Sequence, residues 1–287
     1  MSSNGTVDGL TLARKSVVPN LVKRFLQEGR LAHSFSIKLI ANVDIVYYAA
    51  AAGYEAVLID LEHSSFGLET CNQLSVSALS AGITPIVRVP ANTSDWISRA
   101  LDGGAQAIIV PHVNSAAEAA NVVKYARFAP EGERSATSGM ACLRYASIPA
   151  KYANVAANEE TLVICMIETE RAVEDVESIA AVPGVDVLLI GSSDLTSDMG
   201  IAGDYDSPRL ADAYAKVSAA CAKASVNGRL VSMGIGGLNG RPDLIEKLAT
   251  AHANGRYAMS GADNAMMLAA MRAGAKNTQA MTARLSA

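Results

Sequence analysis

Short apolar runs alternate with stretches in which apolar residues recur at helical spacing along the whole chain. Most of the short runs are continuously apolar, as in parallel strands that are covered on both faces, so they predict strands. The periodic stretches predict helices, and several of them end at a glycine, a frequent stop signal. The predicted strands are Ser34–Ile40, Ala56–Asp60, Thr84–Val89, Ala107–Val110, Leu162–Glu168, Val185–Gly191, Leu230–Met233 and Arg256–Met259. The helices that follow them are Val43–Ala52, Leu68–Ala81, Asp95–Gly103, Ala116–Phe128, Ala172–Ala181, Arg209–Asn227, Asp243–Ala253 and Asn264–Ala280.

Eight strands, each followed by a helix over about 250 residues, indicate a (β/α)8 or TIM barrel of the α/β class. A doubly wound open sheet is the alternative, but it usually has fewer strands in one domain. No linker or change of composition divides the chain. We therefore expect residues 1–287 to form a single barrel domain with an N-terminal extension over about residues 1–32.

Two segments fall outside the regular alternation. Val18–Gln27 predicts an amphipathic helix that precedes the barrel, and Ala129–Asn158 is a long insertion after the fourth strand. Long strand-to-helix connections at the C-terminal face of a barrel are usually functional. We therefore expect the insertion to form a lid or a subunit contact.

The composition limits the kinds of molecule that the protein is expected to bind. The net charge is −4 and the isoelectric point is near 5.6, which argues against a basic face for nucleic acid. The four cysteines lie far apart without a Cys-x-x-Cys motif, so we expect neither disulfides nor a zinc knuckle. No uninterrupted apolar run reaches the roughly 18 residues of a membrane span, and the first residues lack the features of a signal peptide. These features predict a cytoplasmic protein.

Charged or ionisable side chains end five successive predicted strands, at the edge where barrel enzymes carry their active sites. They are Asp60, Glu62 and His63 at the second strand, Arg88 at the third, His112 at the fourth, Glu168 at the fifth and Asp194 at the sixth. Taken singly, each has an ordinary structural interpretation, such as a helix N-cap for Asp194 or one half of an ion pair for Arg88. Taken together, they fit one mechanism.

The mechanism rests on a pair of carboxylates. Glu168 and Asp194 leave the same edge of neighbouring parallel strands, about 4.8 Å apart, and can share one hard divalent cation such as Mg²⁺ or Mn²⁺. Such a cation would chelate the carboxylate and keto oxygens of a 2-oxo acid and act as a Lewis acid toward a developing enolate. Arg88 would stabilise oxyanion charge, and His63 would act as a base whose imidazole Asp60 orients.

Two other features offer competing interpretations. Gly234–Gly240 follows a strand and precedes a helix, like a dinucleotide-binding turn, but its spacing is wrong and no acidic strand end follows it. A loop that lets the backbone approach a ligand is the favoured interpretation. Lys38 is the nearest candidate for a Schiff base, and it ranks below the metal route.

At these residues the chain resembles the HpcH/HpaI family of metal-dependent 2-oxo acid aldolases, from about Ser34 to Ala270. The motifs that carry the resemblance are Ile59–His63, Val87–Pro90, Ala100–Gln106, Ile167–Thr169 and Gly191–Leu195. The resemblance implies a (β/α)8 barrel whose last helix is exchanged between subunits, in a homohexamer built as a trimer of dimers. Arg134–Ser135 and Val110–Val113 also resemble macrophomate synthase, a fungal member that decarboxylates oxaloacetate and couples the enolate.

The resemblance also implies roles for individual residues. Glu168 and Asp194 would hold a divalent cation (Mg²⁺, Mn²⁺ or Co²⁺), and the backbone around Ser193 would contact the bound pyruvate unit. His63 would be the general base, tuned by Asp60 and Asp102, while Arg88 would stabilise the transition state. Met166 stands where many relatives have a glutamine that contacts substrate or water.

The predicted function is that of a class II pyruvate aldolase, a carbon–carbon lyase. It would cleave a 4-hydroxy-2-oxo acid to pyruvate and an aldehyde through a metal-bound pyruvate enolate. An oxaloacetate decarboxylase or a macrophomate-synthase-like enolate-coupling enzyme is the second hypothesis, and a CoA-ester lyase is the third. A non-catalytic barrel that binds oxo acids is the hypothesis from a different class.

Overall fold

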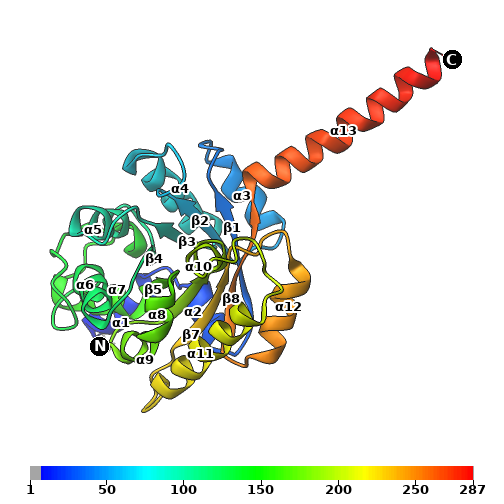
Figure 1. Ribbon diagram of the computed structural model, residues 1–287. Helices are drawn as coiled ribbons and strands as arrows, with labels where there is room; N and C mark the ends of the chain where they lie inside the picture. Colours follow the sequence, from blue (N-terminus) through cyan, green and yellow to red (C-terminus); the bar gives the residue numbers. More distant parts are fainter. Residues whose placement is uncertain (1–7, 287) are drawn as a thin grey trace.

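Eight parallel strands close into a barrel in chain order in the computed structural model, which describes residues 8–286 (Figure 1). Each strand pairs with the next along the chain, and β8 pairs with β1, so the sheet closes on itself. The strands are β1 (Ala32–Ile37), β2 (Ala56–Asp60), β3 (Thr84–Arg88), β4 (Ala107–Val110), β5 (Leu162–Ile167), β6 (Val187–Gly191), β7 (Ser232–Gly236) and β8 (Gly255–Ala262). The predicted α/β class and (β/α)8 fold are confirmed.

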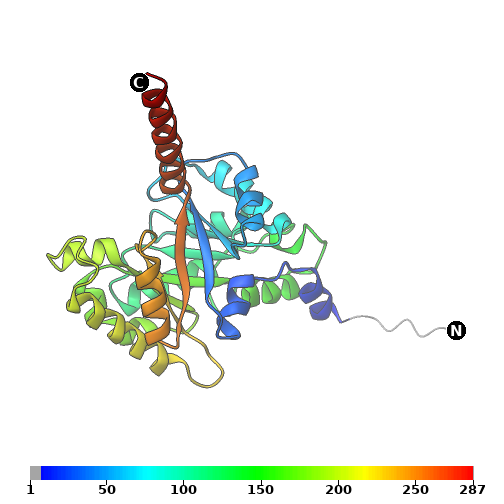
Figure 2. The same ribbon diagram turned by 90° about the vertical axis from the view of Figure 1, so that its right-hand side faces the viewer.

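Helices on the outside of the barrel return the chain from the end of each of the first seven strands to the start of the next (Figures 1 and 2). They are α3 (Asp44–Ala51), α4 (Leu68–Ala81), α5 (Ser94–Asp102), α6 (Ala116–Ala126), α8 (Glu170–Glu174), α9 (Val176–Ala181), α10 (Ser192–Asp198), α11 (Pro208–Ala224) and α12 (Pro242–Ala251). The single helix predicted over 172–181 is two short helices that meet at Asp175. The short α10 was not predicted, since its residues Ser192–Asp198 include only one large apolar side chain.

The seventh strand lies later in the chain than its hydrophobic pattern predicts. Leu230–Met233 is the predicted strand, whereas β7 runs from Ser232 to Gly236. Its two glycines have low strand propensity and interrupt the apolar run, so the hydrophobic pattern does not predict the second half of the strand. In the barrel, pairing with β6 overrides that propensity and sets Gly191 beside Gly236.

Alternate residues of each strand fill the inside of the barrel, while the intervening residues pack against the helices outside. The inward set forms one cluster that includes Leu58, Ile86 and Leu189, and all three are fully buried. Because side chains alternate, the next inward position of β2 and of β3 lies at the C-terminal mouth of the barrel. Those positions carry Asp60 and Arg88.

Two N-terminal helices, α1 (Gly9–Ser16) and α2 (Leu21–Gln27), precede the barrel. The helix predicted over Val18–Gln27 begins at Leu21, because the side chain of Asn20 caps it by accepting the N–H of Lys23 at 3.0 Å. Val22 and Leu26 of α2 belong to the same cluster as the inward-facing strand residues. This helix therefore closes the N-terminal end of the barrel and leaves the C-terminal mouth open.

Ala129–Asn158 does not lie at the C-terminal face of the barrel, where it was expected to form a lid or a subunit contact. The segment follows α6 and includes the short helix η1 (Ala141–Leu143) and most of α7 (Ala150–Glu160), which leads directly into β5. It packs against the N-terminal helices, and the N–H of Val18 donates to the carbonyl of Cys142 at 2.7 Å. The predicted helix ahead of the segment had already returned the chain to the opposite end of the barrel.

The last helix, α13 (Asp263–Leu285), projects away from the barrel instead of packing on it (Figures 1 and 2). Large apolar side chains along it are exposed, including Met266, Leu268 and Met271. Beside β1 and β8, an apolar pocket of about 370 Å³ is lined by residues such as Leu31 and Ile245. Within residues 8–286, no helix has the length and apolar character needed to cross a membrane.

Candidate active site

A buried ion pair lies at the mouth of the barrel between β2 and β3. Asp60 is 0% exposed and Arg88 is 4% exposed. Nε of Arg88 donates to Oδ1 of Asp60 at 3.0 Å, and Nη2 donates to Oδ2 at 2.5 Å. Its remaining nitrogen, Nη1, lies 3.0 Å from Oε2 of Glu62. The guanidinium is thus fixed in a plane by two carboxylates, with geometry that a single ammonium could not reproduce.

The carboxylate of Asp60 is held in its ionised form. Burial acts to raise the pKa of Asp60, but the hydrogen bonds and charge of Arg88, together with the charge of Lys38, lower it to about 2. Burial lowers the pKa of Arg88, yet its contacts with Asp60 outweigh this and leave that pKa above its usual value. Both groups are therefore charged throughout the physiological pH range.

Glu168 follows β5 on the inward side and is 2% exposed. Its Oε2 accepts the backbone N–H of His112 at 2.8 Å and lies 3.3 Å from Nδ1 of the same residue. Burial raises the pKa of Glu168, the contacts with His112 lower it, and the nearby charge of Asp194 raises it further. Its Oε1 has no hydrogen-bond partner among residues 8–286, so this oxygen is available to a ligand.

A pocket of about 380 Å³ opens above these groups at the C-terminal mouth of the barrel. It is lined by Lys38 after β1, His63 after β2, Arg88 in β3, Met166 in β5, Ser193 and Asp194 after β6, Asn239 and Gly240 after β7, and Met259 in β8. Ser193 and Asp194 are exposed, whereas Met166 is buried. The structure therefore gathers most of the residues that the sequence singles out around one pocket.

The loop that carries His63 is fixed by Asp60, but not in the way the sequence predicts. Oδ1 of Asp60 accepts the backbone N–H groups of Glu62 at 3.1 Å and His63 at 3.2 Å. Within residues 8–286, the carboxylate found near the His63 imidazole is Glu62, whose Oε2 lies 3.7 Å from Nε2. Asp60 thus positions the backbone of His63, and orientation of its ring by Asp60 is not seen.

Asp102 does not join this group within one chain. It ends α5, just before the N-terminal end of β4, and its carboxylate accepts Nη2 of Arg134 at 2.6 Å. This places Asp102 at the end of the barrel opposite to the mouth. The role that the family resemblance gives it beside His63 stays a prediction.

Two residues at the mouth have no role in the predicted mechanism. His112 has a φ of 53°, a value that residues other than glycine rarely adopt, and this backbone directs its N–H to Glu168. Asn239 carries a buried Oδ1 with no hydrogen-bond partner among the described residues. The sequence offered a signal for each, since His112 ends a strand and Asn239 lies in the glycine-rich segment 234–240.

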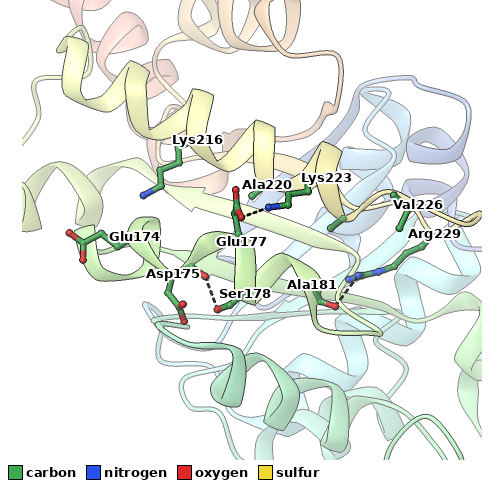
Figure 3. A pocket seen from close by; sticks show the side chains of 11 residues that line it. Glu174, Asp175, Glu177, Ser178, Ala181, Lys216, Ala220, Lys223, Val226 and Arg229 are labelled. Atoms are coloured by element: carbon green, nitrogen blue, oxygen red, sulfur yellow. Dashed lines mark hydrogen bonds and ion pairs between the residues drawn. The ribbon is translucent and has the colours of Figure 1, made fainter.

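A larger pocket, of about 650 Å³, lies outside the barrel between α9 and α11 (Figure 3). Its charged side chains face one another across the opening, and Lys223 pairs with Glu177 at 2.6 Å. Arg229 uses its guanidinium to bind backbone carbonyls after α9, including that of Val182 at 2.6 Å. These charged groups form ion pairs with one another or donate hydrogen bonds at the end of α9. None of the strand-end residues lines this pocket.

The sequence profile of the HpcH/HpaI aldolase/citrate lyase family matches residues 39–261 of the chain. The chain belongs to this family. Among its relatives is the 4-hydroxy-4-methyl-2-oxoglutarate aldolase tasA of Hapsidospora irregularis, which is 40% identical over 79% of this chain and 83% of the relative. The enzyme of the same name from Chaetomium globosum, cghB, is 39% identical over 76% of this chain and 80% of the relative.

Two solved structures share the whole barrel. The HpcH/HpaI aldolase from Desulfitobacterium hafniense superposes with a TM-score of 0.80 at 27% identity, over 90% of this chain and 96% of that one. Macrophomate synthase superposes with a TM-score of 0.69 at 27% identity, over 96% of this chain and 91% of that one. The chain is therefore a carbon–carbon lyase of the HpcH/HpaI family.

Proposed function

We propose that the protein is a divalent-metal-dependent class II aldolase that cleaves a 4-hydroxy-2-oxo acid to pyruvate and a second carbonyl compound. The observation that carries the proposal is the buried Glu168, whose Oε1 accepts no hydrogen bond among residues 8–286 and faces Gly191 of the pocket wall. Asp194, Arg88 and His63 line the same pocket. The names of the two fungal relatives, both aldolases of a 4-hydroxy-2-oxo acid, support it.

The two carboxylates fit a hard divalent cation. Among residues 8–286, no group of three or more His, Cys, Asp or Glu side chains is placed to hold a metal. Glu168 and Asp194 would hold the cation as two carboxylates, since they follow the paired strands β5 and β6 and the charge of Asp194 acts on Glu168. Mg²⁺ is often held by one or two carboxylates, with water and substrate completing its coordination, and Mn²⁺ or Co²⁺ suits similar oxygen ligands. A cation bound there would polarise the 2-oxo group of the substrate.

The other residues at the mouth would perform the proton transfer and stabilise charge. His63 would accept the proton of the 4-hydroxyl group as the bond between C3 and C4 breaks, leaving a new carbonyl at C4. The electron pair of that bond passes to C3 and the 2-oxo group as an enolate, and a proton then adds at C3 to give pyruvate. Arg88 would stabilise the oxyanion charge that develops during this step.

A decarboxylase is the second candidate, because the chain covers nearly all of macrophomate synthase and shares its fold. Loss of CO2 from oxaloacetate would generate the same enolate. A metal-supplemented assay of pyruvate release tests both candidates, with oxaloacetate beside a panel of 4-hydroxy-2-oxo acids. An aldolase turns over the hydroxy acids with higher kcat/KM, whereas the reverse order favours the decarboxylase and contradicts the proposal.

Glycine at position 191 is expected to be required for cation affinity. A Cβ built on Gly191 would lie 2.6 Å from Oε1 of Glu168 and 2.7 Å from its Cγ, closer than real Cβ contacts come. Gly191→Ala should therefore displace the carboxylate and weaken cation affinity by roughly 10- to 100-fold, the effect of a misplacement of about 1 Å. Calorimetric titration with Mn²⁺ measures this. Affinity within twofold of the parent protein would contradict the role of Glu168.

We also propose a homohexamer, a trimer of dimers in which α13 packs on a neighbouring subunit. Its exposed methionine and leucine side chains and the apolar pocket beside β1 and β8 support this arrangement. Asp102 would then be able to approach a catalytic site only in another copy of the chain.

The helix exchange makes a prediction about assembly. Met271 is 64% exposed in one chain, so Met271→Lys should leave the barrel folded but place an unpaired charge in the subunit contact. Light scattering after size exclusion should show a mass reduced at least about twofold, with an unchanged circular dichroism spectrum. An unchanged mass for this variant would contradict the exchanged helix.

A further inference from the structure

Lys38 is the first residue after β1, and its backbone is held rigidly at the barrel mouth. Its N–H and those of Leu39 and Ile40 converge on the carboxylate of Asp263, at 3.1, 2.8 and 2.8 Å. Asp263 is 2% exposed, so this anchor lies out of solvent. The backbone of Lys38 is therefore fixed, and only the methylene groups and ammonium of its side chain can move.

The side chain of Lys38 lines the pocket and is 24% exposed. Its Nζ lies 3.1 Å from Oδ2 of Asp60, a carboxylate that also accepts two hydrogen bonds from Arg88. An ammonium has three N–H donors, and Asp60 is the one charged partner that Nζ has among residues 8–286. Because Arg88 is shared between Asp60 and Glu62, what Lys38 offers a ligand is its remaining N–H donors at the pocket wall.

The order of strands sets Lys38 across the barrel mouth from Glu168. Glu168 follows β5, and β5 is four strands from β1 in either direction around the closed barrel. His63 after β2 and Arg88 in β3 lie between them along the rim. A substrate whose 2-oxo acid end meets Glu168 and Asp194 would extend past His63 and Arg88 toward Lys38.

We propose that Lys38 binds a second carboxylate, carried on the carbon that leaves as the new carbonyl product, and so selects dicarboxylic 4-hydroxy-2-oxo acids. This inference rests on the proposed aldolase function and names its substrate class. The second product is then an oxo acid instead of a simple aldehyde. A lysine ammonium that keeps a proton for this contact is not a nucleophile, so no Schiff base forms at Lys38.

The test compares two substrates that differ only at the end assigned to Lys38. In 4-hydroxy-2-oxoglutarate the leaving carbon bears a carboxylate, and in 4-hydroxy-2-oxovalerate it bears a methyl group. Lys38→Met should lower kcat/KM for the first by roughly 10- to 100-fold, the worth of a hydrogen bond to a charged group, and change the second less than about threefold. Lys38→Arg, which keeps the charge, should retain most of the preference for the dicarboxylate.

Lys223→Met is the matched control, because it removes an exposed lysine from α11 outside the barrel and should leave both substrates unaffected. Equal losses on both substrates in Lys38→Met would overturn the inference. Loss of all activity in both Lys38 variants, with borohydride trapping of the parent enzyme and pyruvate, would instead establish a Schiff base.

A binding measurement separates this inference from the proposed function. With Mg²⁺ present, calorimetry compares 2-oxoglutarate and 2-oxopentanoate on the full-length parent chain and on Lys38→Met. If Lys38→Met weakens the binding of 2-oxoglutarate but not that of 2-oxopentanoate, the role of Lys38 is supported even if neither hydroxy acid is cleaved. Absence of cleavage would contradict only the proposed aldolase function. Equal affinities for the dicarboxylate in the two proteins would reject the role of Lys38 whatever the reaction.

Discussion

Glu168→Gln should abolish cation binding and slow cleavage of a 4-hydroxy-2-oxo acid by about 10³-fold or more. The change keeps the shape of the side chain but removes its negative charge and replaces one of the two carboxylate oxygens with an NH2 group, which cannot bind a cation. A bound cation contributes several kcal/mol of charge stabilisation to the reacting carbonyl, and about 1.4 kcal/mol corresponds to a tenfold change in rate. Initial rates at saturating Mn²⁺ measure the loss, and calorimetry measures the affinity.

A matched control lies two residues further along the chain. Glu170 forms an exposed ion pair with Arg209 on the outside of the barrel, so Glu170→Gln should leave both rate and affinity near those of the parent. Asp194→Asn should behave like Glu168→Gln, because both carboxylates are assigned to one cation. Retained cation affinity in Glu168→Gln, with a circular dichroism spectrum like that of the parent, would contradict that assignment.

Arg88→Met should be the most destabilising substitution at the barrel mouth. It leaves the fully buried Asp60 without the guanidinium that neutralises it, and removal of one partner from a buried ion pair lowers the free energy of unfolding by about 3–5 kcal/mol. Lys38, at 3.1 Å from Asp60, should keep the loss near the lower figure. Urea unfolding followed by circular dichroism measures the change.

The double variant Asp60→Asn, Arg88→Met is the control for that interpretation. Because it removes the buried charge together with its partner, it should be more stable than Arg88→Met alone. Arg88→Lys should rescue little, since one ammonium cannot make both hydrogen bonds. If the free energy of unfolding of Arg88→Met lies within about 0.5 kcal/mol of that of the parent, the ion pair adds little to the backbone pairing of β2 with β3.

The same pair fixes how stability depends on pH. The pKa of Asp60 is lowered to about 2 in the folded protein, below its value of about 3.9 in an unfolded chain. Its ionisation therefore stabilises the fold above about pH 4, and this contribution is lost as the pH falls through 2. Arg88→Met should move the loss to higher pH, because burial then acts on Asp60 with less opposition.

The sequence predicts the barrel well, because continuous apolar runs and periodic stretches alternate with few exceptions. Leu68–Ala81 begins and ends where α4 does. The same pattern also places Glu168 and Asp194 just after neighbouring strands, since consecutive strands in a barrel are adjacent. Where glycine weakens the pattern, as in β7, the boundaries are displaced by two or three residues.

The contacts between side chains depend on local geometry that spacing does not encode. The link from Asp60 to His63 runs through the backbone, and the positive φ of His112 that serves Glu168 has no sequence signal of its own. Asp102 is placed by the end of α5, which carries it to the other end of the barrel. The segment 129–158 lies at the end of the barrel opposite to the predicted one, because α6 before it has already returned the chain.

Exchange of the methyl protons of pyruvate with deuterium from the solvent, followed by NMR, tests the metal-assisted enolate most directly. We predict exchange in the parent protein that stops on chelation, returns with Mg²⁺ or Mn²⁺, and is lost in Glu168→Gln and Asp194→Asn. Exchange that continues at the parent rate in chelator and in both variants would contradict the central claim.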